Sequence, residues 1–257
     1  GAQPQTYALG VKEVWQVAPE RHMPGTVWHS IGWPLSSDTY GGSFLYHMED
    51  NLVSIGFVVG LDYKNPYLDI YQEFQRFKNH PSIRPLLESG ECVQYGARTL
   101  NEGGIQSIPE LVFPGGALIG CSAGFLNVPK IKGTHTAMKS GMLAAEAAVE
   151  ALLSSTPGED AITLDQYSST IKDSWVWEEL HLERNIRPGF KHGLYMGTIN
   201  AAIDTYLFRG RAPWTLSHEG EDHAALEPAA KHTPIEYPKP DHLVSFDNAT
   251  SLHRSGT

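Results

Sequence analysis

Four short β-rich runs in the first 60 positions constrain the fold of this chain more than any other feature. They are Val11–Val17, Thr26–Gly32, Ser43–Met48 and Leu52–Gly60. Apolar residues at every second position are typical of strands that bury one face. Glu49-Asp50-Asn51 separates the last two runs and suits a hairpin turn. We therefore expect the amino-terminal part of the chain to form a β-sheet.

Helical patterns follow these strands. After a break at Asn65-Pro66, apolar residues fall at positions 67, 70, 71, 74 and 77 and form one stripe on a helix. Further helices are expected over Pro81–Gly90, Thr136–Ser154 and Leu164–Leu182, and strands over Cys92–Leu100 and Ala117–Gly120. The alanine-rich helix Thr136–Ser154 is expected to be buried. Strands mixed with helices predict an α+β or mixed α/β fold.

Composition excludes several classes of protein. A chain of 257 residues with 41% hydrophobic and 19% charged residues can bury a core, so disorder is not its dominant state. The formal net charge of -10 argues against nucleic acid as the main partner. Cys92 and Cys121 are too few for a disulfide framework or a four-cysteine iron–sulfur site, and they are typical of reduced thiols. No run of about 18 apolar residues predicts a membrane span.

The segment from Pro114 to Gly141 carries the most chemical information. It reads as a short strand, a glycine-rich turn, a loop with Pro129, and a helix that starts near Gly133. Glycines let a ligand approach the backbone, and a helix start offers unpaired N–H groups and a positive dipole end. Such an end suits an anion, for example the pyrimidine edge of a reduced flavin. The spacing alone is equally compatible with a plain strand–helix packing turn.

The run Gly120–Gly141 resembles the second flavin-binding motif of the glutathione-reductase-related FAD proteins, which include aromatic hydroxylases and geranylgeranyl reductases. Cys121 stands where most of those proteins have an aspartate that binds the ribityl chain. With that departure, the run is similar to one branch, the electron transfer flavoprotein–ubiquinone oxidoreductase family. Matches to this family continue in the same order at Gly32–Leu35, Thr39–His47, Val58–Tyr63, Tyr95–Arg98, Leu100–Gly104, Ser174–Trp177 and Thr233–Pro240.

The resemblance implies a partial glutathione-reductase-like FAD domain with an inserted β-sheet-plus-helix quinone-binding domain. Residues 1–110 would belong mostly to the quinone-binding domain, and residues 111–160 would hold the second FAD motif and its helix. Residues 161–257 would form a helical, membrane-facing segment and a proline-rich tail that leads toward an iron–sulfur domain. The family's Gly-x-Gly-x-x-Gly motif and its cysteine cluster are not in this sequence. We therefore expect the middle of a longer protein, which alone would retain little FAD.

The same resemblance implies two sets of binding residues. The FAD-binding set is Gly120, Cys121, Ser122, Gly133, Thr134, His135 and Thr136, and the ubiquinone-binding pair is Gly41 and Gly42. Tyr40, Phe44 and Leu45 would line an apolar slot beside the glycine pair, and a β-bulge or turn is the alternative explanation for those glycines. His135 would be either a proton carrier or a capping or packing residue.

Other polar residues are expected to have lesser roles. The turn Asn101–Gly104 would lie beside the flavin, or it would be a plain hairpin. His218 and His223 lack the spacing of a metal site and are expected in a solvated loop. No catalytic side chain and no metal ligand is predicted, because electron transfer needs no positioned base or nucleophile.

The family also implies a function. Electrons would pass from reduced electron transfer flavoprotein through FAD, and through a 4Fe-4S cluster with ligands outside this chain, to ubiquinone. The location would be the matrix side of the mitochondrial inner membrane, or the plasma membrane of a bacterium. Two alternatives stay open: a geranylgeranyl-reductase-like or hydroxylase flavoenzyme that acts on a lipid, and a fragment that binds a membrane or a partner without chemistry.

The apolar stretch Gly193–Phe208 is the candidate membrane contact. It is too short and too polar to span a bilayer, but it would lie monotopically in the interface. Lys191, Arg209 and Arg211 would lie near lipid headgroups, with Trp214 as an aromatic anchor. An ordinary buried helix is the alternative.

Overall fold

The computed structural model describes residues 2–155, 161–218 and 220–249. The chain forms two compact units. The helical unit contains residues 1–7 and 101–221, and the sheet unit contains residues 8–100 and 222–257. The two compact units follow from packing, whereas the three segments predicted from the sequence are defined by their binding roles. The three-segment division therefore stays a prediction.

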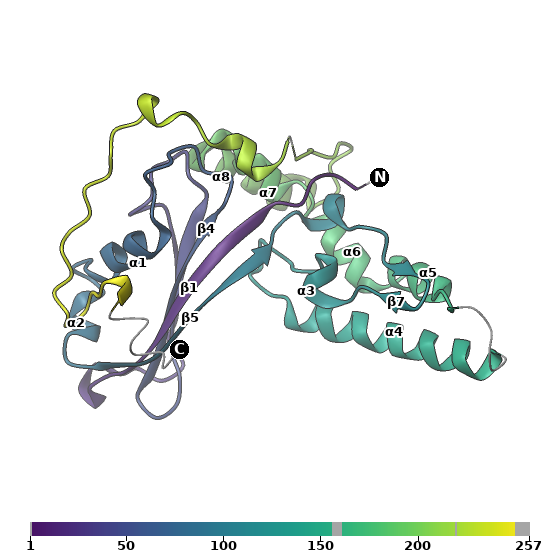
Figure 1. The fold of residues 1–257 in the computed structure, drawn as a ribbon, viewed down its shortest axis with the longest axis horizontal. Coiled ribbons are helices and arrows are strands. Elements are labelled where there is room, and N and C mark those ends of the chain that lie inside the picture. Colours follow the sequence, from purple (N-terminus) through teal and green to yellow (C-terminus); the bar gives the residue numbers. More distant parts are fainter. Residues whose placement is uncertain (1, 156–160, 219, 250–257) are drawn as a thin grey trace. The chain divides into compact units, whose positions relative to one another are not determined.

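The sheet unit is built on strands in the order β2-β3-β4-β1-β5 (Figure 1). Their bounds are β1 Tyr7–Gln16, β2 Val27–Ile31, β3 Gly41–His47, β4 Leu52–Gly60 and β5 Glu91–Asn101. β3 pairs antiparallel with β2 and β4, and β1 pairs antiparallel with β4. The four predicted runs and the predicted strand over Cys92–Leu100 are therefore confirmed. At the β3–β4 turn, Asp50 and Asn51 have positive φ, which these residue types tolerate in turns.

Helices cover one face of this sheet. Alternate residues of β4, among them Ile55, Phe57 and Val59, are fully buried and share a core with α1 (Ile70–Lys78) and α2 (Arg84–Leu87). Helix α1 begins at Ile70 because the carboxylate of the preceding Asp69 accepts a hydrogen bond from the backbone N–H of Gln72. Position 67 of the predicted stripe therefore lies before the helix.

A buried ion pair ties β1 to α1. Lys78 Nζ lies 2.9 and 2.8 Å from the two carboxylate oxygens of Glu13, and Trp15 donates its indole N–H to the same carboxylate. Lys78 has no exposed surface, and its ammonium lies over the rings of Trp15, Phe74 and Phe246. Burial lowers the pKa of Lys78, while the charge and hydrogen bonds of Glu13 oppose that shift.

The proline-rich tail returns to the same helices. The Tyr237 hydroxyl donates a hydrogen bond to Glu73, and Asp241 lies 2.7 Å from Arg84. Phe246 is buried in the core of the sheet unit. Val244 and Phe246 of the tail are therefore part of that core, a contact that no local pattern in the sequence predicted.

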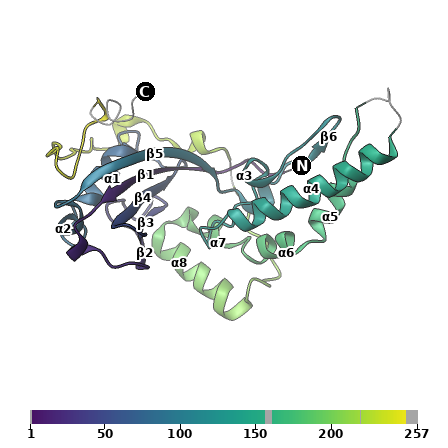
Figure 2. The same cartoon turned by 90° about the horizontal axis from the view of Figure 1, so that it is seen from below.

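The helical unit is arranged around one long helix, α4, which lies beside α3, α5 and α6 (Figures 1 and 2). Its elements are β6 Val112–Phe113, β7 Gly116–Ala117, α3 Gly120–Ala123, α4 Thr134–Ser154, α5 Asp165–Lys172, α6 Trp175–Leu182, α7 Ile186–Gly189 and α8 Leu194–Ala202, which continues as a π-helical turn over Ile203–Phe208. Short 3-10 turns lie at Gly104–Ser107 and Phe190–His192 in this unit, and at Pro19–Arg21, Asp222–Ala225 and Ala229–Lys231 in the sheet unit. Tyr167 is fully buried and donates its hydroxyl to the carbonyl of Leu118, and this burial raises its pKa to about 12.

Three predictions for the helical unit were wrong. The strand expected over Ala117–Gly120 ends at Ala117, and Gly120 instead opens α3 with a φ of 58°. The single helix expected over Leu164–Leu182 is two helices, because the chain breaks at Asp173-Ser174. Helix α4 is not buried on all sides: its outer apolar side chains, Met138, Met142, Val149, Leu152 and Leu153, are exposed.

Candidate flavin, quinone and membrane surfaces

The start of α4 is the strongest candidate contact for a flavin. Gly133 precedes the helix and has no side chain to cap it, and the first helical bond runs from Ala137 N–H to the Gly133 carbonyl. The backbone N–H groups of residues 134–136 therefore have no acceptor within the helix. Twenty-one residues follow in one helix, so this end carries the positive pole of a full helix dipole. The donor set fits an electron-rich ligand edge.

The other predicted FAD-binding residues lie on α3, which packs against the same part of α4. Gly120 donates its N–H to Ser140 Oγ, and a Cβ at Gly120 would lie 3.3 Å from the Ala137 Cβ. The Cys121 carbonyl accepts a hydrogen bond from the Asn101 side chain, and Ser122 is exposed. The fold therefore brings the two predicted groups, residues 120–122 and 133–136, to neighbouring positions in one unit.

Within that set, Thr136 and His135 have different side-chain partners. The Thr136 hydroxyl is fully buried and donates to the carbonyls of Phe125 and Gly133, so only its backbone N–H is left for a ligand. His135 Nε2 lies 2.8 Å from Glu179 Oε1. The His135 ring also stacks on Trp175, with centroids 5.6 Å apart and an angle of 12° between the planes. His135 is thus held on two sides by α6.

Glu179 connects this part of α4 to the preceding loop. Its carboxylate accepts a hydrogen bond from Asn127 Nδ2 at 2.8 Å and lies 3.7 Å from Lys130 Nζ. Partial burial alone would raise the pKa of Glu179, but hydrogen bonds from His135 and Asn127 and the charge of Lys130 together lower it. Sequence reasoning missed Glu179, since it follows His135 by 44 positions and stands in no motif.

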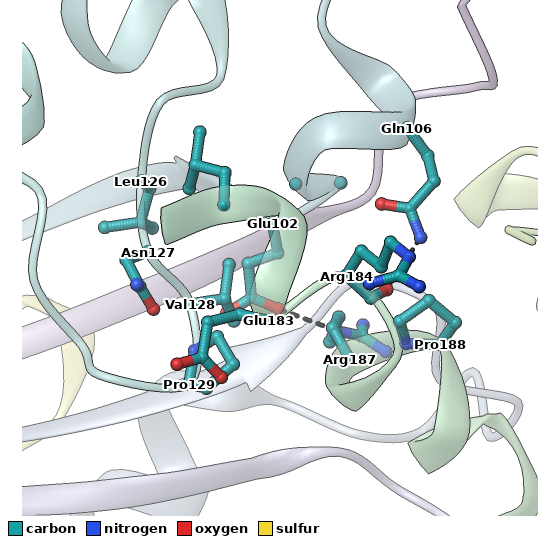
Figure 3. A pocket seen from close by; sticks show the side chains of 13 residues that line it. Glu102, Gln106, Leu126, Asn127, Val128, Pro129, Glu183, Arg184, Arg187 and Pro188 are labelled. Carbon is teal, nitrogen blue, oxygen red and sulfur yellow. Dashed lines mark hydrogen bonds and ion pairs between the residues drawn. The ribbon is translucent and has the colours of Figure 1, made fainter. Parts of the chain in front are cut away.

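A small pocket, open to solvent, lies next to this loop (Figure 3). Residues 102–106, residues 126–129 and helices α6 and α7 line it. Glu102 and Arg187 form a buried ion pair in its wall, with 3.0 Å between Glu102 Oε2 and Arg187 Nε. Burial raises the pKa of Glu183 on the same wall. The predicted turn at Gly103-Gly104 thus lines a small, solvent-open pocket.

The histidines expected in a solvated loop have separate environments. His218 is half-buried: its Nε2 lies 2.7 Å from the Gly103 carbonyl, and its backbone N–H donates to Gln3. The expectation of a solvated loop was therefore wrong for His218, which holds the 103 turn in place. His223 is exposed in the sheet unit. Among the described residues, no three His, Cys, Asp or Glu side chains converge on a possible metal site.

Gly41 and Gly42 lie at the start of β3, in the interior of the sheet. The register runs without interruption through both residues, so neither a bulge nor a turn explains them. Close packing does. A Cβ at Gly41 would meet the Leu35 side chain and the Val58 carbonyl, and a Cβ at Gly42 would meet the Ser30 carbonyl.

The backbone groups of the two glycines face different neighbours. Gly60 donates its N–H to the Tyr40 carbonyl, and hydrogen-bonded pairs alternate along an antiparallel ladder, so Gly42 also bonds toward β4. The N–H and C=O of Gly41 then point toward the β2 side, where β2 has ended at Ile31. Of the two glycines, Gly41 is therefore the one whose backbone N–H and C=O lie past the end of β2.

The apolar slot expected beside these glycines has to be corrected. Leu45 is buried in the core of the sheet unit, whereas the Phe44 ring lies over Gly56 on the opposite face. Neighbouring residues of a strand point to opposite sides, so Phe44 and Leu45 do not line one slot.

Helix α8 and its π-helical extension expose an apolar surface on the helical unit. Tyr195, Tyr206 and Leu207 are 73%, 83% and 71% exposed, and Met196, Ile199 and Ile203 are exposed as well. The basic residues Lys191, Arg209 and Arg211 are exposed at either end of this segment, and Trp214 lies edge-on against Phe208. The buried-helix alternative does not describe this surface. In the part of the chain that the structure describes, no helix combines the length and hydropathy needed to cross a bilayer.

Arg184 holds the loop that follows this surface. Its guanidinium donates to the carbonyls of His181, Gly210, Ala212 and Trp214 and to the Thr215 hydroxyl. The adjacent Asn185 accepts a hydrogen bond from the Leu216 N–H. These bonds fix the loop that follows the apolar segment to the chain between α6 and α7, and α7 lies beside α8 (Figure 2).

Two solved structures have a partly similar fold. A geranylgeranyl bacteriochlorophyll reductase-like protein from Thermoplasma acidophilum is 14% identical, with a TM-score of 0.40 over 97% of this chain and 51% of that chain. A flavin-dependent brominase is 14% identical, with a TM-score of 0.44 over 81% of this chain and 52% of that chain. At these scores the likeness carries no functional information.

Sequence comparisons give a much closer match. The mitochondrial electron transfer flavoprotein-ubiquinone oxidoreductase of Oryza sativa subsp. japonica is 56% identical over 255 residues, which are 99% of this chain and 43% of the relative. The Arabidopsis thaliana protein of the same name is 59% identical over 256 residues, 100% of this chain and 40% of the relative. The Homo sapiens protein is 56% identical over 261 residues, 99% of this chain and 42% of the relative.

The chain thus spans less than half the length of these relatives. Residues 7–100 match the family model described as ETF-QO, ubiquinone-binding, and these residues include all five strands of the sheet unit up to Leu100. The resemblance inferred from the motifs is confirmed: from end to end the chain is similar to a segment of electron transfer flavoprotein-ubiquinone oxidoreductase, with the ubiquinone-binding family match at residues 7–100.

Proposed function

We propose that this chain is part of an enzyme that passes electrons from reduced electron transfer flavoprotein through FAD to ubiquinone. A 4Fe-4S cluster with ligands outside the chain takes part in the whole protein. The observation that carries the proposal is the match of residues 7–100 to the ubiquinone-binding family. Identity of 56% to 59% along nearly the whole chain favours this function over a flavoenzyme that reduces or hydroxylates a lipid.

The start of α4 would hold the pyrimidine end of the flavin. Bound FAD supplies the two-electron chemistry, and the chain's task is to orient and polarise it. The N–H groups of Thr134, His135 and Thr136 and the positive helix end would stabilise the negative charge of the reduced state. Gly120, Cys121 and Ser122 on the adjacent α3 would approach the ribityl chain and pyrophosphate, as expected of a glutathione-reductase-like FAD domain.

The start of β3 would hold the quinone ring. Gly41 would offer its N–H and C=O to quinone oxygens, since these groups lie past the end of β2. Gly42, the second residue of the proposed quinone-binding pair, would let the strands pack closely beside this contact, because it has no Cβ to meet the Ser30 carbonyl. No side chain is needed as acid, base or nucleophile in this role.

The exposed apolar side chains of α8 and its π-helical extension would rest in a membrane interface. Ubiquinone is lipid-soluble, so an enzyme that reduces it needs apolar surface at the bilayer. Basic residues at both ends of this segment would lie near anionic headgroups, with Trp214 at the interface. The named relatives are mitochondrial, and we place this protein on the matrix side of the inner membrane, or on the plasma membrane if its source is a bacterium.

Two half-reactions of the full-length protein that carries this chain test the proposal. Reduced electron transfer flavoprotein should bleach the bound flavin, and a short-chain ubiquinone analogue should restore its absorbance within the same preparation. A flavin that electron transfer flavoprotein does not reduce, or that reoxidises only with oxygen and not with quinone, would contradict it. A geranylgeranyl lipid offered as oxidant serves as the control for the lipid-reductase alternative.

A further inference from the structure

Glu179 and His135 form a fixed pair at the point where the proposed function puts the flavin. His135 is the second residue of α4, and Glu179 lies on α6. The hydrogen bond between them is 2.8 Å long, and stacking on Trp175 fixes the plane of the imidazole ring.

The pairing decides which ring nitrogen remains available. Glu179 is ionised at neutral pH because hydrogen bonds and the charge of Lys130 lower its pKa, so it accepts the proton on His135 Nε2. In the neutral imidazole the other nitrogen, Nδ1, is then a bare acceptor, and in the cation it carries a second proton. Nδ1 is therefore the atom that gains or loses a proton while the bond to Glu179 persists.

The charges around the pair come from the loop at Lys130, from α6 and from the start of α4. Lys130 on the loop lies 3.7 Å from both Glu179 Oε2 and Glu183 Oε1, and Glu183 belongs to the end of α6. The backbone N–H groups of the first turn of α4 add their positive partial charge. The negative charges of Glu179 and Glu183 thus balance the positive charges of the Lys130 ammonium and the helix end. When a ligand here becomes negatively charged, a proton on His135 balances the added charge.

We propose that Glu179 is a positioning residue that holds His135 as a proton acceptor for the flavin, so that Nδ1 binds one proton when the flavin is reduced. The inference rests on the proposed function. When bound, FAD would supply the two-electron chemistry, with two electrons from its donor and one proton from solvent, and His135 would take a second proton from solvent to form Nδ1–H. Flavin and His135 together then hold the two electrons and two protons that conversion of a quinone to a quinol consumes.

The reduction potential of the flavin in the full-length protein, measured against pH, tests this inference. The reduction potential falls twice as steeply with pH when two protons are taken up per two electrons as when one proton is taken up. The wild type should show the steeper slope near neutral pH, and His135→Gln should show about half of it. Glu179→Gln should change the slope in the same pH range, whereas Glu178→Gln, an exposed neighbour on α6, should leave it unchanged. An unchanged slope in a well-folded, flavin-bound His135→Gln protein would overturn the inference.

A second measurement needs no flavin. Nitrogen-15 NMR of the flavin-free full-length protein should show the proton of neutral His135 on Nε2, and Glu179→Leu should spread it over both nitrogens. A wild-type ring with its proton on Nδ1 would contradict the role of Glu179. Failure of the proposed function can be told apart from failure of this inference. A protein that binds no flavin gives no reduction potential to measure, in the wild type or in the variant.

Discussion

Gly42 leaves room for the backbone of a neighbouring strand, and that packing makes its own prediction. A Cβ at this position would press on the Ser30 carbonyl, which belongs to the sheet and cannot move independently of it. We expect Gly42→Ala to lower the free energy of unfolding by roughly 1–3 kcal/mol through overpacking. Urea unfolding of the protein measures this.

Gly96 on β5 is the matched control for that substitution. A Cβ at Gly96 has no heavy atom within 4 Å, so Gly96→Ala should be close to neutral. Equal stability of the Gly42 and Gly96 variants would remove packing as the reason for glycine at position 42. In that case a slowed quinone half-reaction in a stable Gly42 variant would point to the ligand instead.

Asp241 gives the sheet unit a pH-dependent contact. Partial burial alone would raise the pKa of Asp241, but hydrogen bonds from the backbone N–H groups of residues 243–245 and from Arg84 lower it well below its usual range. Since the folded pKa is the lower one, the ionised form stabilises the fold above the unfolded value of about 3.9. That contribution is lost as the pH falls through the folded pKa.

We therefore expect Asp241→Asn to reduce stability at pH 6 and to have a shrinking effect as the solution becomes more acidic than about pH 4. Urea midpoints at a series of pH values measure the difference between wild type and variant. Glu91→Gln, at the exposed start of β5, is the control. A difference that stays constant down to pH 2 would show that Asp241 acts by shape rather than charge.

At the scale of elements, the sequence predicted strands better than helix ends. Strands β1, β3 and β4 have buried residues on one face, so their alternation is visible in the sequence, as in Val53, Ile55, Phe57 and Val59 of β4. The break at Asp173-Ser174 contains neither glycine nor proline, and no pattern in the neighbouring residues predicts it. Gly120 was placed in a strand because its positive φ, which opens α3, depends on packing against Ala137 and Ser140.

The apolar surface of α8 and its extension makes a prediction at the same scale. Replacing the exposed Leu207 by Asp removes a side chain that would enter the interface and adds a charge there. Loss of one buried leucine corresponds to about 1.5–3 kcal/mol, so partitioning into vesicles should fall about tenfold or more. Sedimentation of the full-length protein with vesicles of phosphatidylcholine and cardiolipin measures it.

Met23→Asp is the control for that experiment, since Met23 is exposed on the sheet unit. It should leave vesicle binding nearly unchanged. Identical binding of the Leu207→Asp protein and the wild type would remove α8 as the membrane contact, and the apolar surface would then need another partner.

In the molecule as a whole, the candidate sites and the core depend on residues that only the fold brings together. The motif around residues 120–141 indicated a flavin site, and the uncapped start of α4 is compatible with it. Glu179, Arg184 and the tail residue Phe246 could not be predicted, because each acts on partners far away in the sequence. Long-range contacts of this kind leave no periodic pattern in the residues around them.

The match to the ubiquinone-binding family leads us to expect that ubiquinone binds to residues 7–100. Photo-crosslinking with an azido-ubiquinone in the full-length, flavin-bound protein, followed by peptide mass spectrometry, tests it most directly. We predict that the label attaches to peptides from the sheet unit around the start of β3 and the end of β2, and that excess ubiquinone suppresses it. Specific labelling confined to peptides outside residues 7–100 would contradict the account.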